Sequence, residues 1–243
     1  MALYVIADLH LSVKEQRLCA AFVAFVKKLK PGDKLIISGD FFNFFVGIDL
    51  NDSCHLQIKN TLQEAKDNHI AVFFQHGNRD FLITPKEAEF FNFTLLPDHY
   101  VDNTGPEPCL IMHGDSLCTN DLKYQRFKEI TSKAWLQRLF FALPLWIRKK
   151  IALSLRDNSQ NTTQKGRDPA IYGIVFKTLE DLLVAYNCNI VIHGHLHQFG
   201  EHQDEVLHEK KRFALGDWGK YYSFVKIDDK GAELCQYPLS DLL

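Results

Sequence analysis

Five apolar runs of the chain end in polar residues, and this repeated ending restricts the possible folds more than any other feature. The runs are "LYVIADLH", "KLIISGD", "AVFFQHGNRD", "CLIMHGD" and "NIVIHGHLH". Short, continuously apolar segments are typical of strands buried on both faces. Amphipathic stretches of helical period separate the first three, near residues 18–29 and 56–68. The pattern predicts an α/β sheet covered by helices on both sides.

The polar residues after these runs form one candidate site, because ligands of α/β sheets bind at the carboxyl ends of the strands. Two carboxylates, one amide and four imidazoles lie there: Asp8, His10, Asp40, Asn78, His113, His195 and His197. Asp8 and His10 are two residues apart, so we expect both to point to one side of an extended chain. His195 and His197 repeat that spacing.

This mixture of ligands suits Mn²⁺, Fe or Zn. Seven ligands are too many for one ion, but they fit two ions if Asp40 bridges them. Metal pairs about 3.5–4 Å apart are a device for hydrolysis. Taken alone, the Asp-x-His pair also fits a loop or a helix cap, and His-Gly-His-x-His also fits a solvated loop. The five endings together predict a metal site.

Residues 116–168 show helical periodicity and no strand signal. Pro144 is expected to divide them into two or more helices, with "NSQNTTQKGRD" as a polar, flexible exit. We expect a core of residues 1–115 and 170–243 and a helical insertion, residues 116–169, between the fourth and fifth polar endings. A helix over residues 170–185 and three closing antiparallel strands, in "RFALGDW", "YYSFVKID" and "AELCQYPL", complete the expected order.

The insertion carries a wide apolar face bordered by the bases Arg148, Lys149 and Lys150. Its members are Trp135, Leu136, Leu139, Phe140, Phe141, Leu143, Leu145, Trp146 and Ile147. Such a face packs against a core in most proteins, but it also suits acyl chains and the surface of an anionic bilayer. Both interpretations stay open at this point.

Charge narrows the classes of partner. The net charge of −2 argues against a general nucleic-acid binder. Residues 120–170 carry eleven Lys/Arg and four Asp/Glu, which indicates an anionic partner or membrane surface near this segment. We expect the six cysteines to be reduced thiols. The N-terminus does not fit a signal peptide and no apolar run fits a spanning helix, so a cytoplasmic protein with at most a peripheral membrane contact is expected. We also expect a monomer.

These motifs identify a resemblance to the calcineurin-like metallophosphoesterases. Their pattern is Asp-x-His, Gly-Asp, Gly-Asn, His and Gly-His-x-His, which corresponds here, in the same order, to Asp8/His10, Gly39/Asp40, Gly77/Asn78, His113 and Gly194/His195/His197. The resemblance implies a four-layer α/β/β/α sandwich, with the helical insertion between the fourth and fifth ligand-bearing strands as a lid.

One position departs from most of that superfamily. A His that assists the leaving group usually follows the Asn, and this chain has Arg79. Arginine is no general acid at neutral pH, but it binds phosphate as a fork. We therefore expect Asn78 to bind a metal and Arg79 to bind the phosphate of a substrate, although a surface Arg in a turn is the simpler interpretation.

Longer matches, "QHGNRDFL", "HGDSLCTND" and "WLQRLFFALPLWIRKKIA", resemble the UDP-2,3-diacylglucosamine diphosphatases of lipid A biosynthesis. This resemblance implies a hydrolase with two Mn²⁺ ions at the cytoplasmic face of the inner membrane, which cleaves a lipid-linked UDP-sugar into UMP and 2,3-diacylglucosamine 1-phosphate. It implies substrate contacts from Asn78, Arg79, Asp121, Ser159 and His195, and from Lys165 or Arg167. Tyr124 and Arg156 are lesser candidates. Asn43, Phe45 and Ile48 depart from the family, which usually has an acid, a Trp and a second acid there.

The expected catalytic residues are Asp40, Asn78, Arg79 and His113. One metal would take Asp8, His10, Asp40 and His197, and the other Asp40, Asn78, His113 and His195. A metal-bridging hydroxide would attack the α-phosphorus. Two other functions stay open: a phosphodiesterase or diadenosine polyphosphate hydrolase for soluble nucleotides, and a non-catalytic metal-binding scaffold.

Overall fold

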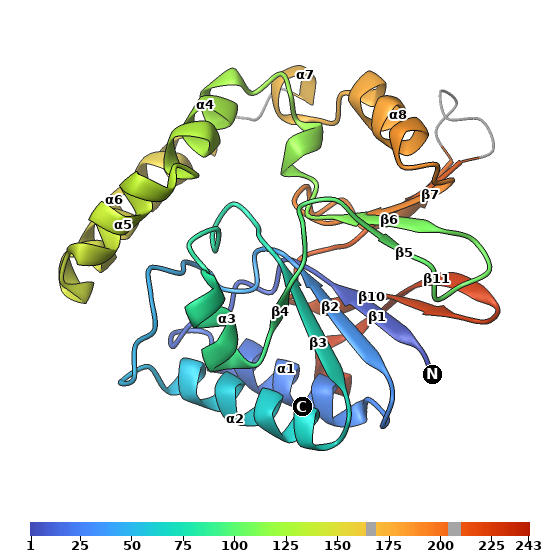
Figure 1. Cartoon of the computed structure of the whole chain (residues 1–243), viewed down its shortest axis with the longest axis horizontal. Helices are drawn as coiled ribbons and strands as arrows, with labels where there is room; N and C mark the ends of the chain where they lie inside the picture. The colour runs from blue at the N-terminus through green and yellow to red at the C-terminus, as the bar shows by residue number, and fades with distance from the viewer. Residues whose placement is uncertain (164–168, 204–209) are drawn as a thin grey trace.

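The structure is a computed structural model that describes residues 1–163, 169–203 and 210–243, without the side chains of residues 156–163 and 169. Its first sheet has six strands in the order β11-β10-β1-β2-β3-β4 (Figure 1). They are β1 (Leu3–Ile6), β2 (Lys34–Ser38), β3 (Ala71–Gln75), β4 (Thr94–Leu95), β10 (Tyr221–Asp228) and β11 (Gly231–Pro238). Strands β1 to β4 are parallel, whereas β10 runs antiparallel to both β1 and β11.

The second sheet has five strands in the order β5-β6-β7-β9-β8. They are β5 (Tyr100–Asp102), β6 (Cys109–Met112), β7 (Ile190–His193), β8 (Gly200–His202) and β9 (Lys211–Ala214). The expectation of a purely antiparallel C-terminal region was wrong for β9, which pairs parallel with β7 and antiparallel only with β8. Because β8 occupies the edge and reverses the chain, β9 returns in the direction of β7.

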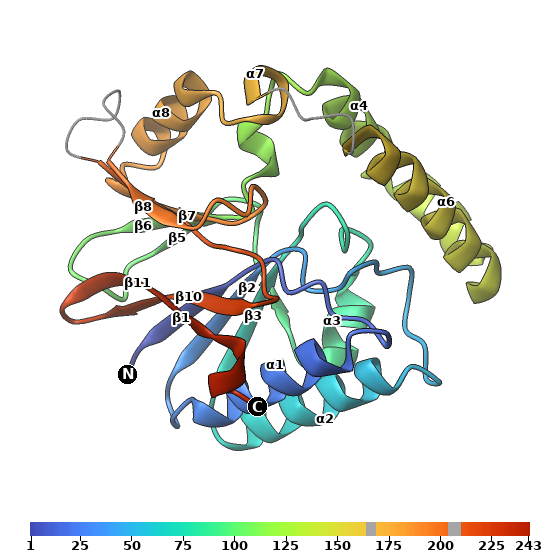
Figure 2. The same cartoon turned by 180° about the vertical axis from the view of Figure 1, so that it is seen from behind.

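Helices cover the outer face of each sheet, which confirms the α/β/β/α sandwich (Figures 1 and 2). Helices α1 (Gln16–Lys28), α2 (Ser53–Asp67) and α3 (Pro85–Phe91) pack on the first sheet, and α8 (Phe176–Ala185) packs on the second. Short 3₁₀ turns lie at Asp115–Leu117 (η1) and Leu239–Asp241 (η2).

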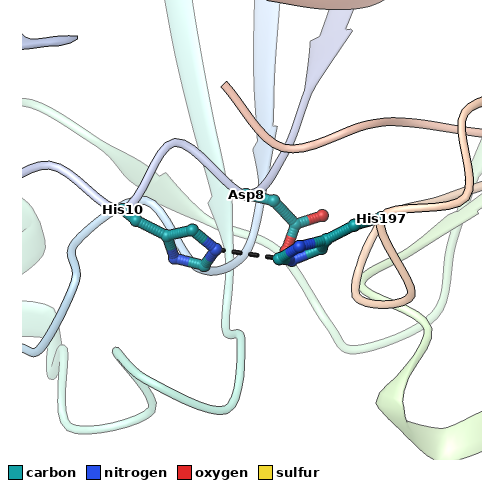
Figure 3. A group of neighbouring side chains, drawn as sticks. All are labelled: Asp8, His10 and His197. Carbon is teal, nitrogen blue, oxygen red and sulfur yellow. Dashed lines mark hydrogen bonds and ion pairs between the residues drawn. The ribbon is translucent and has the colours of Figure 1, made fainter. Parts of the chain in front are cut away.

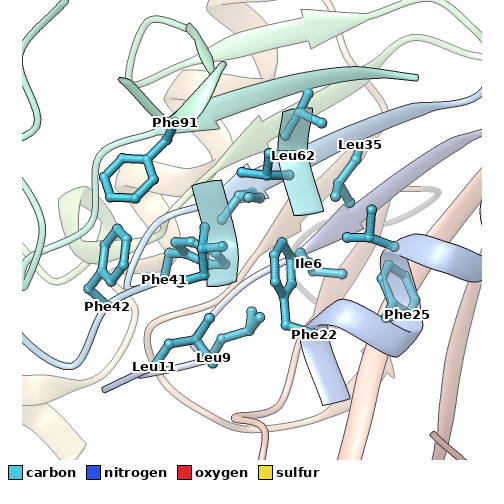
Figure 4. Packing of buried hydrophobic residues seen from close by; sticks show 14 of the residues in the cluster. Ile6, Leu9, Leu11, Phe22, Phe25, Leu35, Phe41, Phe42, Leu62 and Phe91 are labelled. Carbon is cyan, nitrogen blue, oxygen red and sulfur yellow. The ribbon is translucent and has the colours of Figure 1, made fainter. Parts of the chain in front are cut away.

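Alternating side chains of the strands fill separate cores, because successive residues of a strand point to opposite faces. Val5 and Ile36 lie between the two sheets. Ile6 and Leu35 instead face the helices, where they join Phe22 (Figure 4). Each such side chain contributes about 1.5–3 kcal/mol by burial. Both faces of the central strands are therefore apolar, as the continuous runs predicted.

Three helices, α4 (Leu122–Thr131), α5 (Ala134–Ala142) and α6 (Leu145–Thr163), project beyond the sheets, and we call them the helical arm (Figure 1). Pro144 lies between α5 and α6, which confirms the predicted break. The exit expected at "NSQNTTQKGRD" was partly wrong, because α6 continues to Thr163; residues 164–168 lie outside the described residues. None of the helices in the described ranges has the length and apolar character that crossing a membrane requires.

The single helix expected over residues 170–185 is two helices, α7 (Pro169–Tyr172) and α8. Gly173 follows α7, and glycine disfavours a helix by about 1 kcal/mol relative to alanine. Val175 then takes an extended conformation (φ −89°, ψ 103°) at the N-terminus of α8. The half-buried Ile174 packs on the core beneath α8, so tertiary packing stabilises the break.

The expectation of six reduced thiols was wrong for Cys19 and Cys54, which form a disulfide between α1 and α2. Both residues are buried where the two helices pack together, with Cα atoms 6.1 Å apart. Their 35-residue separation left no local signal of this contact. The other cysteines, at positions 109, 118, 188 and 235, are buried and form no disulfide in the structure.

Candidate metal centre

The candidate site lies where strands of both sheets end side by side. Asp8, Asp40 and Asn78 follow the parallel strands β1, β2 and β3 of the first sheet. His113 and His195 follow the parallel strands β6 and β7 of the second. The sandwich therefore brings Asp8 and His195, which are 187 positions apart, into hydrogen-bond contact.

One group in this site consists of Asp8, His10 and His197, whose potential ligand atoms lie within 4.8 Å of one another. The two imidazoles approach with their Nε2 atoms 3.4 Å apart (Figure 3). His197 Nε2 also lies 3.4 Å from Asp8 Oδ1. Three potential donors thus point to one small volume.

A second group consists of Asp8, Asp40 and His113, again with ligand atoms within 4.8 Å. The Oδ1 atom of Asn78 joins it, 3.1 Å from His113 Nε2 and 2.9 Å from His195 Nδ1. Because Asp8 belongs to both groups, the structure brings all seven residues of the sequence prediction into one cluster. Their role as metal ligands stays a prediction.

The backbone at these residues differs from the extended conformation that we expected. Asp8, His10, Asp40, His195 and His197 are all left-handed, with φ between 50° and 68°. This region costs a non-glycine residue about 1–3 kcal/mol and is frequent at functional sites. Backbone hydrogen bonds hold it in place, including those from Asp8 N to Gly39 O and from His10 N to Asp40 O. The side chains converge through these turns and not through strand alternation.

Two glycines permit the close approach of the turns. A Cβ atom at Gly194 would lie 2.2 Å from Asp8 Oδ2, and one at Gly77 would lie 2.2 Å from the backbone nitrogen of Asp40. Neither distance leaves room for a side chain. Both carboxylates of the cluster are therefore placed against backbone.

Burial and neighbouring charges shift the pKa values of several side chains in the cluster. Burial raises the pKa of Asp40 to about 7. Burial would lower the pKa of His113, but the carboxylates of Asp40 and Asp8 raise it to about 9. Burial lowers the pKa values of His10 and His195 to about 3, so these imidazoles are neutral and keep a lone pair for a ligand bond.

These residues fit a bound metal ion. Among the described side chains, the buried atoms Asp8 Oδ1 and His10 Nδ1 have no hydrogen-bond partner. Leaving such atoms buried without a partner costs about 1–3 kcal/mol each, and a coordinated cation would supply the partner for the carboxylate. Nitrogen and oxygen donors of this kind suit Mn²⁺, Fe or Zn.

Arg79 lies at the edge of the cluster. Its backbone N–H donates to Asp40 Oδ1 (2.9 Å), and its Nε lies 3.3 Å from Asp40 Oδ2. The side chain keeps 31% of its surface exposed, so the guanidinium remains accessible beside the buried carboxylate.

Sequence reasoning did not assign a role to Asp80, the last residue of the Gly-Asn-Arg-Asp stretch. This carboxylate is fully buried and accepts hydrogen bonds from the backbone nitrogens of Asp40, Phe41, Phe42 and Gly77, at 2.7–3.3 Å. It therefore joins the loops that carry Asp40 and Asn78. The position of Asp80, a charged residue two places after the predicted ligand Asn78, was the sequence feature that could have indicated this role.

Asp115 directly follows the His-Gly pair of the fourth run. Sequence reasoning did not assign it the structural role that its contacts with α4 indicate. It is buried and bonded to Tyr124 Oη (2.5 Å) and Lys128 Nζ (2.9 Å). The Tyr124 ring in turn stacks on His195, with centroids 6.3 Å apart. Asp115 thus connects α4 to the cluster.

The structure does not place the remaining predicted substrate contacts in the seven-residue cluster. Asp121 caps α4, where its Oδ1 accepts from Tyr124 N, and in the part of the chain described here no contact links it to the seven-residue cluster. Ser159 and Arg156 belong to α6, but their side chains are outside the description. Lys165 and Arg167 lie outside the described residues.

Two adjoining cavities lie between the helical arm and the core. The apolar cavity, about 210 Å³, is lined by Arg79 and by side chains that include Phe45, Leu82, Leu136, Phe140 and Ile151. The mixed cavity, about 400 Å³, is lined by residues that include Asn78, Ile83, Tyr124 and Phe127. Phe81, Thr131 and Gln137 line both. The cluster therefore borders a space large enough for a ligand.

The apolar stripe of the insertion divides between two faces. Leu136 and Phe140 face the apolar cavity, whereas Trp135, Leu139 and Trp146 are each at least 60% exposed. Two of the flanking bases contact the core: Arg148 bonds to Val46 O, and Lys149 pairs with Asp49. The bases thus hold α6 against the loop that precedes α2.

Comparisons with known proteins identify relatives of this chain. The sequence profile of the family described as "Calcineurin-like phosphoesterase" matches residues 1–199. A curated UDP-2,3-diacylglucosamine hydrolase of Haemophilus influenzae is 37% identical over 94% of this chain and 95% of its own length. Proteins of the same name are 38% identical in Photorhabdus laumondii (96% and 98% covered) and 36% identical in Escherichia coli O157:H7 (98% and 100% covered).

A solved structure of a phosphoesterase from E. coli aligns with a TM-score of 0.48 and 15% identity, over 100% of this chain and 96% of that chain. The profile match and the curated relatives, which cover nearly the whole chain, establish the relationship. The chain belongs to the calcineurin-like phosphoesterase family.

Proposed function

We propose that this chain hydrolyses the pyrophosphate bond of UDP-2,3-diacylglucosamine to UMP and 2,3-diacylglucosamine 1-phosphate in lipid A biosynthesis. The relatives that match it end to end are named as hydrolases of this substrate. The observation that carries the proposal is the apolar cavity lined by Arg79 beside the cluster, because a soluble nucleotide needs no such space.

We propose two Mn²⁺ ions as the cofactors. Asp8, His10, Asp40 and His197 would hold one, and Asp40, Asn78, His113 and His195 would hold the other. When bound, such a pair lowers the pKa of water and stabilises charge on the phosphoryl oxygens. The near contacts among Asp8, His10 and His197 support the first set, and those of Asn78 with His113 and His195 support the second. Asp40 lies with Asp8 and His113, next to both sets.

Arg79 is proposed to bind the phosphate and stabilise charge that develops during attack on the α-phosphorus. Its position between Asp40 and the cavity supports this role. The leaving sugar 1-phosphate is a weak base, so the absence of a histidine at this position agrees with hydrolysis without a dedicated general acid.

The two cavities are proposed to hold the acyl chains, with residues 116–169 as the lid over the remaining core. Each buried methylene contributes about 0.8 kcal/mol. The aliphatic and aromatic lining of the apolar cavity supports this binding mode. Binding energy from the lipid then leaves Arg79 and the cluster to act on the transition state.

A peripheral contact with the cytoplasmic face of the inner membrane is part of the proposal. Trp135 and Trp146 are 64% and 61% exposed on the helical arm. Lys150 lies over the Trp146 ring at 5.3 Å. Exposed aromatic side chains next to bases suit the interface of an anionic bilayer.

Release of UMP from UDP-2,3-diacylglucosamine in detergent, with and without Mn²⁺, tests the proposal. We expect Mn²⁺-dependent release and little turnover of cyclic AMP or diadenosine tetraphosphate. Rapid cleavage of the soluble nucleotides alone would favour the phosphodiesterase alternative. No turnover with any divalent metal would favour a binding scaffold.

A further inference from the structure

The loop between β2 and α2 brings Asn43 next to Arg79. The backbone N–H of Asn43 donates to Leu11 O (2.9 Å), and the N–H of Phe45 donates to Arg79 O (3.0 Å). The loop is therefore attached both to the turn that carries Asp8 and to the turn that carries Asn78. These hydrogen bonds fix the backbone position of Asn43, and therefore the place from which its side chain reaches Arg79.

Two of the three guanidinium nitrogens of Arg79 are held. Nη1 donates to Asn43 Oδ1 (3.0 Å), and Nε lies 3.3 Å from Asp40 Oδ2. In the described residues, Nη2 makes no hydrogen bond. An arginine has five N–H donors, so a substrate oxygen still finds free donors on a guanidinium whose orientation is already set.

The charge of the residues that contact the Arg79 guanidinium also affects how strongly it can bind a phosphate. In the described part of the chain, Asp40 is the only carboxylate paired with Arg79. Asn43 supplies an acceptor without a second negative charge. The guanidinium is thus oriented while part of its positive charge remains available for a phosphate.

We propose that Asn43 is a positioning residue that orients Arg79 toward the phosphate of the substrate. The inference rests on the proposed function, because it assumes that Arg79 binds a phosphate. Asn43 acts through Arg79 and contacts no reacting atom.

Substitutions of Asn43 separate the acceptor from the bulk of the side chain. Asn43→Ala and Asn43→Leu remove the acceptor and should each lower kcat/KM for UDP-2,3-diacylglucosamine about 10-fold. Asn43→Asp keeps an acceptor of the same shape but adds a negative charge, so its loss of kcat/KM should be smaller than that of the Ala and Leu variants. Asn60→Ala, at an exposed position of α2, is the matched control. A Leu variant as active as the wild type would overturn the proposal.

A double-mutant cycle tests whether Asn43 acts through Arg79. In the Arg79→Ala background, Asn43→Ala should cause no further loss of kcat/KM. An equal loss in both backgrounds would show a structural role and would overturn the proposal. Unchanged melting temperatures show that the variants are folded.

The same cycle is measured on the Kd of inorganic phosphate by calorimetry, which needs no turnover. The positioning proposal is supported if Asn43→Ala weakens phosphate binding in the wild-type background but causes no further weakening in the Arg79→Ala background. This result would support positioning even if UMP is not released. The lack of UMP release would then show that the proposed substrate is wrong. If UMP is released but Asn43→Ala leaves phosphate binding and kcat/KM unchanged, only the positioning proposal is wrong.

Discussion

The seven-residue cluster and the helical arm are built in different ways. Side chains of the cluster such as Asp8 and His113 are at most 2% exposed and are fixed by backbone hydrogen bonds from turns at the strand ends. Helices α4 and α5 contain no buried residue. We therefore propose that the sandwich supports the chemistry, whereas the more exposed helical arm contacts the lipid.

This difference predicts two classes of variant. Changes in the cluster should impair every phosphate ester, including a small substrate such as bis(p-nitrophenyl) phosphate. Changes in the arm should impair only the lipid substrate.

Asp40→Ala should have the largest effect. It removes the carboxylate that we propose as the bridge, so kcat for both substrates should fall about 10³-fold or more, with loss of bound metal measured by elemental analysis. Asp67→Ala, at an exposed position of α2, is the control. Full activity of Asp40→Ala on either substrate would contradict the proposed centre.

Removal of the disulfide tests the sandwich alone. Because the bond closes a separation of 35 residues, Cys19→Ala/Cys54→Ala should lower the free energy of unfolding by about 3–4 kcal/mol, measured by urea titration. Dithiothreitol should destabilise the wild type similarly and leave the variant unchanged. Detection of six free thiols in the unreduced, unfolded wild type, in place of the four predicted, would refute the bond.

Phe140→Ser tests the arm. It makes the wall of the apolar cavity polar, so kcat/KM for UDP-2,3-diacylglucosamine should fall about 10-fold, while cleavage of bis(p-nitrophenyl) phosphate should be unchanged. Leu139→Ser alters the adjacent, exposed face of α5 and should have little effect in detergent. Equal losses on both substrates would remove the distinction between arm and cluster.

The last prediction concerns the proton on His113. The pKa of His113 is raised from 6.5 to about 9 by Asp40 and Asp8, despite the opposite effect of burial. In the metal-free protein, this proton stabilises the fold below pH 6.5, and the stabilisation is lost as pH rises through 9. A metal must displace it, so Mn²⁺ affinity should rise about tenfold per unit between pH 7 and 9. Calorimetry in buffers of different ionisation enthalpy should detect proton release, and a pH-independent affinity would contradict this.

The sequence predicted those features that depend on local pattern. Apolar runs predicted the strands, and their polar endings predicted which side chains meet. The left-handed turns at Asp8 and His195 could not be predicted, because distant segments stabilise them. The backbone N–H of Asp8 donates to Gly39 O, and the backbone N–H of His195 donates to Asp8 Oδ2. The Cys19–Cys54 bond, the parallel pairing of β9 and the role of Asp80 likewise depend on neighbours far along the chain.

Anomalous diffraction at the manganese edge, from crystals grown with Mn²⁺, tests the central claim most directly. The account predicts two peaks, one among Asp8, His10, Asp40 and His197 and the other among Asp40, Asn78, His113 and His195. A crystal of active protein without a peak among these residues would contradict it.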